Sequence, residues 1–520
     1  MKNILLLLLL LWTIPALYSQ TVFHKFLTQN NASGYLYRCL QTSDGGYATA
    51  GLLMIDTSFD NNFLVAKFNV DGKRIWIKSL GSPDSDEFTD VIETADSGII
   101  AVGTTVNFNT FLSTAVVAKF NSAGLKVWSK TYTLSGMSST AKKIQKDADG
   151  NLYVFGTVEV GGSVNHYYIM KLNSDGNTLQ QTTISSTFSD FAISFLREST
   201  GDFVIGGWGN DGTGENIHII KISSAFSMLW NKYISGSIKL YAYDMKEKSD
   251  GNILLAGSYD DGTNPYEALI IEMDNSSGEV VWAKRYSPSN NLGIYAYGLA
   301  INSGDRIAIT GIVEDFNSGL IAFEVSPAGI VNWSKRITSA NELSSVGYGI
   351  CKSFEGGYVI SGSRTGIDNS CFQLLKTTIG GGVQCMGTDL NLADTDVVIS
   401  SQSIVVTTGS ASLTAQDIVY PETVYTTFED ACEPLSVDEQ VAENDFSVYP
   451  NPSWGNFVVS CNAIQAESSL MMYNASGMLV YRTNSINSPL FEVNLDLQAG
   501  IYFLQLNTDG KLLTRKVLIR

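Results

Sequence analysis

Three histidines, His24, His166 and His218, have side chains suited to binding a metal or moving a proton. His166 and His218 stand in similar contexts, NHYYIMK and NIHIIK, so a fold that superposes these segments could bring the rings together. No carboxylate accompanies them at ligand spacing, which favours partly exposed histidines at strand ends over a metal or proton-transfer site. The motifs GxSxG and HExxH and the P-loop do not occur, so no catalytic residue is predicted.

Loops rich in Asp and Gly are a second group of candidates, because loops that present many oxygen atoms can hold calcium. None of them spells the EF-hand loop with its terminal Glu, and tight turns alone explain Asp-Gly pairs. We therefore predict no metal or other cofactor, with calcium kept as an alternative. The loops are NVDG at 69–72, DADG at 147–150, GNDGTGEN at 209–216 and YDDGTN at 259–264.

These loops belong to a repeat of about 52 residues. One phrase, an Asp/Gly turn followed by a short apolar strand that ends in Gly, occurs seven times at intervals of 50 to 54 residues. A fixed period of this size, with four short strands in each unit, is typical of a β-propeller blade. The copies are DGGYATAG (44–51), DSGIIAVG (96–103), DGNLYVFG (149–156), TGDFVIGG (200–207), DGNILLAG (250–257), GDRIAITG (304–311) and EGGYVISG (355–362).

A tryptophan marks the predicted fourth strand of most units and is followed two residues later by Lys. A large rigid ring suits the space between adjacent twisted sheets, so packing between blades is favoured over a sugar-stacking platform. The third unit departs from the pattern, with Gln180 and Thr182 at these positions. The predicted blade-packing residues are Phe23, Trp76, Trp128, Trp230, Trp282 and Trp333.

Phe23 belongs to this set because VFHK at 22–25 matches the fourth-strand sequences IWIK and VWSK. Phe23 lies 53 residues before Trp76, whereas the seventh unit reads GGGVQC where its own fourth strand is due. The first strand of the chain is therefore predicted to complete the seventh blade, beside the segment near Phe372. Such closure leaves no exposed edge in the last sheet.

Tyrosines recur in the predicted first strands, which should line the central channel of a propeller. Channel packing is favoured for them over contact with a sugar or peptide. The variable loops between second and third strands should gather at one face of the ring, where ligands usually bind to a rigid scaffold. The tyrosines are Tyr35, Tyr37, Tyr241, Tyr243, Tyr295, Tyr297 and Tyr348.

The repeats resemble the seven-bladed propellers of exported bacterial proteins, with the pattern D-G-G-Y, A-G, K-x-N-x-x-G and W-x-K. The resemblance implies an all-β fold with a seven-bladed propeller at residues 20–385, and it says little about activity. DNSSGEVVW at 274–282 is also similar to repeats of quinone-dependent dehydrogenases and of outer-membrane assembly propellers. The adjacent cysteine pair of a quinone site is absent, so only blade sequence is shared.

The N-terminus has the layout of a secretory signal peptide, with Lys2, an apolar run from Ile4 to Trp12, and Ser19 before the predicted cleavage. Residues 1–19 are therefore predicted to be removed, and no later apolar stretch is long enough to span a bilayer. Apolar residues make up 44% of the chain and charged residues 16%, which favours a folded protein over a disordered one. The net charge of −18 excludes nucleic acid as a favoured partner.

Residues 386–445 lack the repeat and are predicted to be a Val/Thr/Ser-rich spacer and linker that ends in the acidic segment 433–445. Cys385 and Cys432 bracket most of it, and a disulfide between them is a pairing that an exported protein allows. Cys39 and Cys351 lie on the first strands of neighbouring blades but one register apart, which disfavours their pairing.

Residues 446–520 alternate short strands with Gly/Asn turns, which indicates a small β-sandwich. This segment resembles the type A C-terminal sorting domain of the type IX secretion system, with all three blocks of that family in order. The resemblance implies type IX machinery as a partner, export through the periplasm, removal of the module, and release or attachment at the outer-membrane surface. The matching positions are Pro450, Asn451, Pro452, Gly455, Phe457, Gly477, Gly500, Tyr502 and Lys516.

Three functions remain open for the propeller. A non-catalytic binding module for a glycan, peptide or surface partner is favoured. A polysaccharide-active enzyme, a lyase or hydrolase with its site at the channel mouth, and a structural surface component are the alternatives. Clustered ionisable side chains with shifted pKa values at the channel mouth would favour the enzyme, and a channel lined by small and aromatic residues would favour the others.

Overall fold

The regular elements of the computed structural model are β-strands throughout the residues that it describes. The chain divides into two compact units, Met1–Cys432 and Glu433–Arg520, and each is considered by itself. The described residues are 22–27, 33–54, 61–134, 136–160, 164–210, 214–236, 239–263, 265–315, 317–338, 342–366, 370–384, 387–409, 413–424, 429–430, 447–461, 468–474, 478–486, 488–508 and 511–520.

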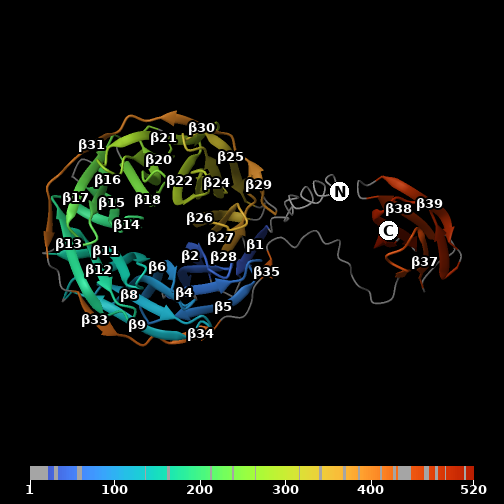
Figure 1. The fold of residues 1–520 in the computed structure, drawn as a ribbon, viewed down its shortest axis with the longest axis horizontal. Helices are drawn as coiled ribbons and strands as arrows, with labels where there is room; N and C mark the ends of the chain where they lie inside the picture. The colour runs from blue at the N-terminus through green and yellow to red at the C-terminus, as the bar shows by residue number, and fades with distance from the viewer. Residues whose placement is uncertain are drawn as a thin grey trace, which may run out of the picture. The chain divides into compact units, whose positions relative to one another are not determined.

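In the described part of the first unit, strands β1 to β28 form seven sets of four antiparallel strands, arranged as a ring (Figure 1). We call each set a blade and number the blades along the chain; the first strand of each lies innermost. Blade 1 contains β2 (Ser33–Gln41), β3 (Tyr47–Met54), β4 (Asn61–Phe68) and β5 (Arg74–Leu80); blade 2 contains β6 (Ser85–Glu93), β7 (Ile99–Val106), β8 (Ser113–Phe120) and β9 (Lys126–Thr133); blade 3 contains β10 (Ser139–Lys146), β11 (Leu152–Val160), β12 (Val164–Leu172) and β13 (Thr178–Ser186); blade 4 contains β14 (Ser189–Arg197), β15 (Phe203–Asn210), β16 (Glu215–Ile222) and β17 (Met228–Ser235).

The remaining blades repeat this arrangement, and the last of them draws its fourth strand from the other end of the chain. Blade 5 contains β18 (Lys239–Glu247), β19 (Ile253–Asp260), β20 (Glu267–Met273) and β21 (Val280–Pro288); blade 6 contains β22 (Gly293–Ile301), β23 (Ile307–Glu314), β24 (Gly319–Val325) and β25 (Val331–Ile337); blade 7 contains β26 (Glu342–Lys352), β27 (Tyr358–Gly366), β28 (Ser370–Lys376) and β1 (Phe23–Leu27).

Strand β1 pairs antiparallel with β28, in a register that runs from Phe23 opposite Lys376 to Leu27 opposite Phe372. The chain therefore places its N-terminal strand where the sequence predicts it. Phe23 is 2% exposed and joins a buried cluster with residues of β2 to β5, so the closing strand also seals the junction between blades 7 and 1.

The hairpin turns form for reasons local to each turn. In the turn after β4, the side-chain oxygen of Asn69 accepts the backbone N–H groups of Asp71 and Lys73, and Gly72 takes a φ of 72°. Asp147 makes the same type of bond to Asn151 in blade 3. These side-chain oxygens serve their own turns, as in Asx-type turns, and no group of three His, Cys, Asp or Glu in the described residues could hold a metal ion.

The predicted blade-packing aromatics lie against glycines in the outer turns of the following blade. A Cβ atom added to Gly124 of blade 2 would lie 2.6 Å from the ring of Trp76 in blade 1, so only glycine fits beneath the ring. Trp76 also donates from Nε1 to the carbonyl oxygen of Ser122, at 3.1 Å, across the same junction. The pairs are Phe23 with Gly72, Trp76 with Gly124, Trp128 with Gly176, Trp230 with Gly278, Trp282 with Gly329 and Trp333 with Gly381.

The junction between blades 3 and 4 departs from this scheme on both sides. Gln180 replaces the aromatic residue, and Phe226 replaces the glycine with a φ of 65°. The Phe226 side chain is 5% exposed and packs against Tyr153 and Phe203, while Gln180 donates to the carbonyl oxygen of Ala225. The junction is thus filled from the opposite blade, which the sequence reading of Gln180 as a simple departure missed.

The segment 387–430 is not a spacer, which corrects the sequence interpretation. Each of its strands pairs antiparallel with the outermost strand of one blade, and together they follow the rim of the ring, drawn in orange in Figure 1. We call this segment the belt. It runs against the blade order: β29 (Gly387–Asp389) on blade 6, β30 (Leu392–Asp396) on blade 5, β31 (Ser400–Gln402) on blade 4, β32 (Val406–Gly409) on blade 3, β33 (Thr414–Asp417) on blade 2, β34 (Glu422–Val424) on blade 1 and β35 (Glu429–Asp430) on blade 7.

The belt also contributes apolar side chains to the spaces between blades. Leu413 and Tyr420 are each 4% exposed and join the buried clusters of blades 2 and 3 and of blades 1 and 2. Leu392, Ile399 and Val406 pack against three further clusters. The backbone of this segment covers the outer edges of the blade sheets.

The second unit contains two small sheets around one apolar cluster, in agreement with the predicted sandwich. The three-stranded sheet contains β36 (Ser447–Tyr449), β37 (Asn456–Ser460) and β40 (Leu490–Asn494); the four-stranded sheet contains β39 (Leu479–Ile486), β38 (Ser468–Asn474), β41 (Gly500–Thr508) and β42 (Lys511–Ile519).

The described cysteines, Cys39, Cys351, Cys371 and Cys461, are free thiols. Cys385 and Cys432, the predicted disulfide, lie outside the described residues. The Cys39 thiol donates to the carbonyl oxygen of Val359, which is the residue opposite Cys351 in the ladder of blade 7. Blades 7 and 1 therefore meet closely at these two first strands.

Candidate functional site

The glycine that ends each repeated phrase shapes the channel. In all seven blades a Cβ atom at this glycine would lie 1.7 to 1.8 Å from a carbonyl oxygen of the first strand, so no other residue allows the strands to come so close. The close approach accompanies a β-bulge, an extra residue in the first strand that has no partner in the second. The glycines are Gly51, Gly103, Gly156, Gly207, Gly257, Gly311 and Gly362.

The seven extra residues converge on a single cavity of about 300 Å³ in the channel. Because each blade contributes its bulge residue, the cavity exists only in the assembled ring. Two more residues, Glu87 and Lys143, complete the described lining. We call this cavity the channel pocket. Its bulge residues are Tyr37, Thr89, Lys142, Ile193, Tyr243, Tyr297 and Tyr348.

Tyrosines form one side of the channel pocket. The rings of Tyr37, Tyr348, Tyr297 and Tyr243, from blades 1, 7, 6 and 5, follow one another with centroids 5.4, 5.6 and 5.1 Å apart. Each of the three from blades 1, 6 and 5 stacks on a second tyrosine two residues earlier in its strand, with centroids 6.0 Å apart. The predicted channel tyrosines thus form one continuous aromatic wall; the second tier is Tyr35, Tyr295 and Tyr241.

The phenols of this wall remain protonated near neutral pH. Burial raises the pKa of Tyr243 and of Tyr348 to about 12, and burial followed by the nearby Glu87 carboxylate raises that of Tyr37 further. Burial also raises the pKa of Tyr297. The wall therefore offers hydroxyl groups that donate or accept hydrogen bonds, and it offers no phenolate base.

The opposite side of the pocket is polar and comes from blades 2 and 3. Lys142 donates to Oε1 of Glu87 at 3.3 Å, and both side chains are 31% exposed. Thr89 donates to the carbonyl oxygens of Ala141 and Lys142, each at 3.0 Å, which ties the two bulges together. The pocket therefore has an aromatic half and an ionic half.

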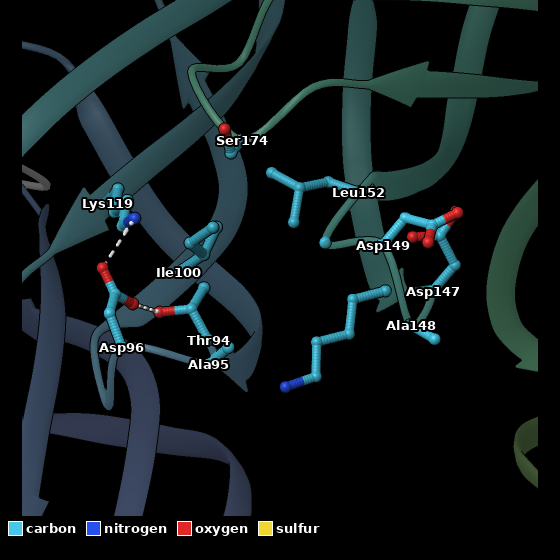
Figure 2. Close-up of a pocket in the computed structure, with 12 residues that line it drawn as sticks. Thr94, Ala95, Asp96, Ile100, Lys119, Asp147, Ala148, Asp149, Leu152 and Ser174 are labelled. Atoms are coloured by element: carbon cyan, nitrogen blue, oxygen red, sulfur yellow. Dashed lines mark hydrogen bonds and ion pairs between the residues drawn. The ribbon is translucent and has the colours of Figure 1, made fainter.

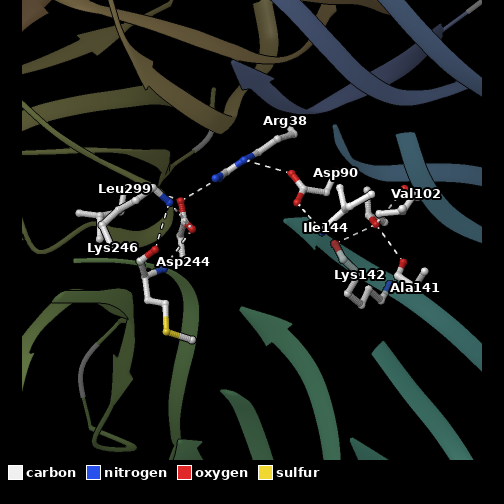
Figure 3. A network of polar contacts seen from close by, with 11 residues as sticks. Arg38, Asp90, Val102, Ala141, Lys142, Ile144, Asp244, Lys246 and Leu299 are labelled. Atoms are coloured by element: carbon white, nitrogen blue, oxygen red, sulfur yellow. Dashed lines mark hydrogen bonds and ion pairs between the residues drawn. The ribbon is translucent and has the colours of Figure 1, made fainter. Parts of the chain in front are cut away.

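Residues that follow the bulges form a buried ion network across the channel (Figure 3). Arg38 of blade 1 pairs through Nη1 with Asp244 of blade 5 at 2.8 Å and through Nε with Asp90 of blade 2 at 3.3 Å. Blades 1 and 5 are not neighbours in the ring, so this contact spans the channel. The two carboxylates also accept the backbone N–H groups of Leu299 and Ile144, in blades 6 and 3.

The electrostatics of the network follow from these contacts. Burial alone would raise the pKa of Asp244, but Arg38 and then Lys246 hold it far below its usual range. Burial lowers the pKa of Lys246 to about 8, with Asp244 opposing the shift. Burial by itself would lower the pKa of Arg38, but Asp244 and Asp90 raise it, so Arg38 stays charged and ties blades 1, 2 and 5 together.

None of the three histidines takes part in the channel pocket. His24 is 1% exposed in the closing strand, contacts Oε1 of Gln373 at 3.2 Å, and has a pKa that burial lowers to about 4. His218 is buried in β16 with Nδ1 at 2.8 Å from Oδ1 of Asp190. Burial lowers the pKa of His166, which is half-buried in β12. The carboxylate partner of His218 lies 28 residues away in sequence, beyond the reach of motif spacing.

A second cavity of about 410 Å³ lies between blades 2 and 3, among the turns that follow their first strands (Figure 2). Ala95, Ile100 and Leu152 supply apolar walls, and Asp96 pairs with Lys119 at 3.1 Å beside them. Its lining comes from only two blades. The channel pocket, to which the whole ring contributes, is therefore the stronger candidate for a functional site.

Most of the predicted sorting residues lie within the described part of the second unit. Asn451 donates to the carbonyl oxygen of Lys516 at 2.7 Å and accepts from the backbone of Leu518 at 2.8 Å, which ties the 450–452 segment to β42. Gly455 has a φ of 92° and lies too close to the carbonyl oxygen of Leu495 for any side chain. Pro450, Pro452 and Gly500 belong to the described residues, Phe457 and Tyr502 are buried, and Gly477 lies outside the description.

Comparison with known protein families matches residues 447–520 to the secretion system C-terminal sorting domain. Proteins with this domain are exported by type IX secretion to the cell surface or the extracellular space. No curated protein sequence matches the chain. Among the described residues, no helix has the length and apolar character needed to cross a membrane.

Solved structures similar to this chain include a β-propeller domain and two other proteins, all at low sequence identity. An ulvan lyase of polysaccharide lyase family PL25 has a TM-score of 0.44 and 9% identity, with 68% of this chain and 96% of that chain covered. The β-propeller domain of the Trilobed protease from Pyrococcus furiosus has a TM-score of 0.39 and 11% identity, with 68% and 97% covered. A protein of unknown function from Dyadobacter fermentans DSM 18053 has a TM-score of 0.41 and 9% identity, with 68% and 98% covered.

At these identities and TM-scores the similarity carries no conclusion about this chain. The sorting domain, in contrast, is matched in sequence over its whole length, and it agrees with the resemblance seen in the Pro450, Asn451 and Pro452 block. The chain therefore contains a β-propeller and carries a type IX secretion C-terminal sorting domain, which marks it as an exported protein.

Proposed function

We propose that the propeller is a non-catalytic binding module that takes a glycan in the channel pocket. The observation that carries this proposal is the convergence of one bulge residue from each blade on one cavity, four of them tyrosines in ring contact. Aromatic faces pack against the apolar faces of sugars, and phenol hydroxyls can bond to sugar hydroxyls at the same time.

The polysaccharide-active enzyme is the alternative, and the protonation of the pocket argues against it. A lyase or hydrolase needs a base or a pair of carboxyl groups at the reacting bond. The pocket-lining tyrosines have raised pKa values, and Glu87 is the one carboxylate in the described lining, held by Lys142. This leaves the Lys143 amine, whose pKa burial lowers, as the group that a lyase would have to use as its base. A purely structural surface role would not require a pocket of this composition.

The proposal is tested by screening the mature chain on a glycan and peptide array and measuring affinity for each hit by calorimetry. We expect Tyr297→Ala to weaken binding about tenfold or more, since the stacking of a ring on an aromatic side chain is typically worth more than about 1 kcal/mol. Tyr297→Phe should retain most of the affinity. Phe354→Ala, at a 68% exposed ring in the turn between β26 and β27, is the matched control and should bind normally.

Two results would contradict the proposal. Equal affinity of the Tyr297→Ala variant and the unmodified protein for every glycan hit would place binding elsewhere. Cleavage of an array glycan, detected as new reducing ends or unsaturated products, would favour the enzyme instead.

A further inference from the structure

Lys143 is the one cationic side chain of the channel pocket that makes no described ion pair. It follows the bulge residue Lys142 in β10 and lines the cavity together with the tyrosine wall. Among the described residues, no hydrogen bond or ion pair within 4 Å involves its ammonium group, whereas Lys142 is paired with Glu87. Its amine is therefore available to a molecule that enters the pocket.

The carboxylates near Lys143 are already engaged. Asp244 pairs with Arg38 at 2.8 Å and with Lys246 at 2.9 Å, and Asp90 pairs with Arg38 at 3.3 Å. Four cations therefore meet three carboxylates around the pocket and the network beneath it, which leaves one positive charge unmatched although the chain as a whole has a net charge of −18. The cations are Arg38, Lys142, Lys143 and Lys246, and the carboxylates are Glu87, Asp90 and Asp244.

An unmatched ammonium in such a place is costly to keep charged. Burial lowers the pKa of Lys143, and the Arg38 guanidinium lowers it further, while Asp90 and Asp244 oppose the shift in part. A ligand carboxylate in the cavity would supply the missing negative charge in surroundings where water screens it little. Binding of such a group would then be more favourable than at an exposed lysine.

We propose that the channel pocket takes an acidic sugar, with the carboxylate of a uronic acid held by Lys143 and the sugar ring against the tyrosine wall. This inference rests on the proposed glycan-binding function and specifies the class of glycan. The two halves of the pocket have separate tasks: the tyrosines supply affinity for sugar rings in general, and Lys143 supplies the preference for acidic ones.

The first test compares ligands that differ only in charge. The probes are oligosaccharides of galacturonate, of mannuronate and of alternating glucuronate, each measured beside its carboxyl-reduced, neutral counterpart by calorimetry. We expect at least one acidic member to bind about tenfold or more tightly than its reduced counterpart, the factor typical of a charged hydrogen bond. Equal affinity within every pair would overturn the inference.

Variants assign that preference to one side chain. Lys143→Met keeps the length of the side chain and removes its charge, so the acidic and reduced ligands should bind with nearly equal affinity. Lys143→Arg should restore part of the preference. Lys146→Met, on the same strand but outside the lining of the channel pocket, is the matched control and should keep the preference. A preference that survives in Lys143→Met would overturn the assignment.

Proton uptake gives a second readout that a merely structural lysine would not move. A carboxylate beside Lys143 raises the pKa of its amine, so the complex takes up protons at pH values between the pKa in the free protein and the pKa in the complex. Calorimetry in two buffers of different ionisation enthalpy measures this uptake. Lys143 faces Arg38, Asp90 and Asp244 from β2, β6 and β18, with Lys142 on its own strand.

Lys246, with a pKa of about 8, is the other amine that could contribute, so only uptake abolished by Lys143→Met counts in favour. Uptake that persists in this variant, together with a retained acidic preference, would contradict the inference. Failure of the inference stays distinct from failure of the proposed function. If the reduced oligosaccharides still bind and Tyr297→Ala still abolishes that binding, the pocket is a glycan site without acid recognition.

Discussion

The inner and outer rims of the propeller are built from the same repeat, but the outer rim keeps its side chains nearly uniform and the inner rim varies them. At the outer rim, an aromatic ring over a glycine recurs at six of the seven blade junctions. At the inner rim, the bulge recurs in every blade, but its side chain changes from Tyr37 to Thr89, Lys142 and Ile193 around the ring. Uniform residues hold the blades together, and varied residues at one repeated backbone feature form the site.

The difference separates what the scaffold needs from what the ligand needs. The glycine that closes each phrase belongs to the scaffold, because a side chain there would collide with backbone. The residue that this bulge turns toward the channel is free to vary, so the repeat can change its ligand without changing its fold. The predictions below test this separation, from the largest expected effect to the smallest.

Deletion of residues 22–27 should have the largest effect, because it removes the fourth strand of blade 7. Phe23 and Phe26 are 2% and 5% exposed there, and losing a buried Phe side chain typically costs about 3–5 kcal/mol. We expect the loss to exceed about 5 kcal/mol, comparable with the whole stability of many domains. Urea denaturation measures it, and an unchanged midpoint would refute the role of β1 in closure.

Arg38→Met should be the most damaging single substitution at the inner rim, since it leaves Asp90 and Asp244 buried without their shared partner. Breaking a buried pair in this way costs about 3–5 kcal/mol. Adding Asp90→Asn to Arg38→Met should recover part of the loss, because Asp90 then carries no unpaired charge while Asp244 keeps its pair with Lys246. A melting temperature equal to that of the unmodified protein would show that the network is dispensable.

Acidification should weaken the closing strand through His24. The unfolded chain takes up a proton near the ordinary pKa of 6.5, whereas the folded chain does so only near 4, so stability is lost as the pH falls between these values. The full difference amounts to about 3 kcal/mol. Denaturation at pH 7 and pH 4.5 should show a smaller loss for His24→Gln; an identical loss would assign the acid sensitivity to other groups.

Gln180→Trp restores the outer-rim consensus at the junction of blades 3 and 4 and should nevertheless destabilise the protein. Phe226 already fills this space, and overpacking costs about 1–3 kcal/mol. Combining the change with Phe226→Gly recreates the arrangement of the other junctions, so the double variant should be more stable than the sum of the single effects predicts. A double-mutant cycle measures this coupling. Additive effects of the two substitutions would argue against the idea that Phe226 takes the place of the missing aromatic residue.

Ile193→Tyr should have the smallest effect on stability. Ile193 is the bulge residue of blade 4 and lines the channel pocket, so a tyrosine there would resemble its counterparts in blades 5, 6 and 7. We expect the free energy of unfolding to change by less than about 0.5 kcal/mol. A change in glycan preference without a change in melting temperature would support the separation of the two rims. A large loss of stability would contradict it, because the inner-rim residue would then also matter for the fold.

The sequence predicted those features that the repeat itself contains. The seven phrases, the outer aromatics and the match of Phe23 to the fourth strands all depend on local residue types at a fixed period, and the fold class follows from them. The belt was missed because its strands are two to five residues long and carry no period. Their partners are set by the ring, which has to exist before the belt has edges to pair with.

Only part of the candidate site could be predicted from the sequence. Tyrosines on the first strands were recognised, but the glycine that closes each phrase was read only as the end of a strand and not as the cause of a bulge. Arg38, Asp90, Lys143 and Asp244 occupy one position of the repeat, directly after the bulge. Charges of both signs at an inward-facing strand position have to neutralise one another, and this signal could have revealed the network.

The belt gives the protein a preferred direction of failure under load. Tension applied from the C-terminal side reaches β35 first, then β34 and each following belt strand, because the belt meets the blades in reverse order. Each of these strands is short, so the belt strands would detach one after another, one blade at a time. If the C-terminal side is held at a surface, the detached belt could lengthen under tension while the ring of blades stays closed.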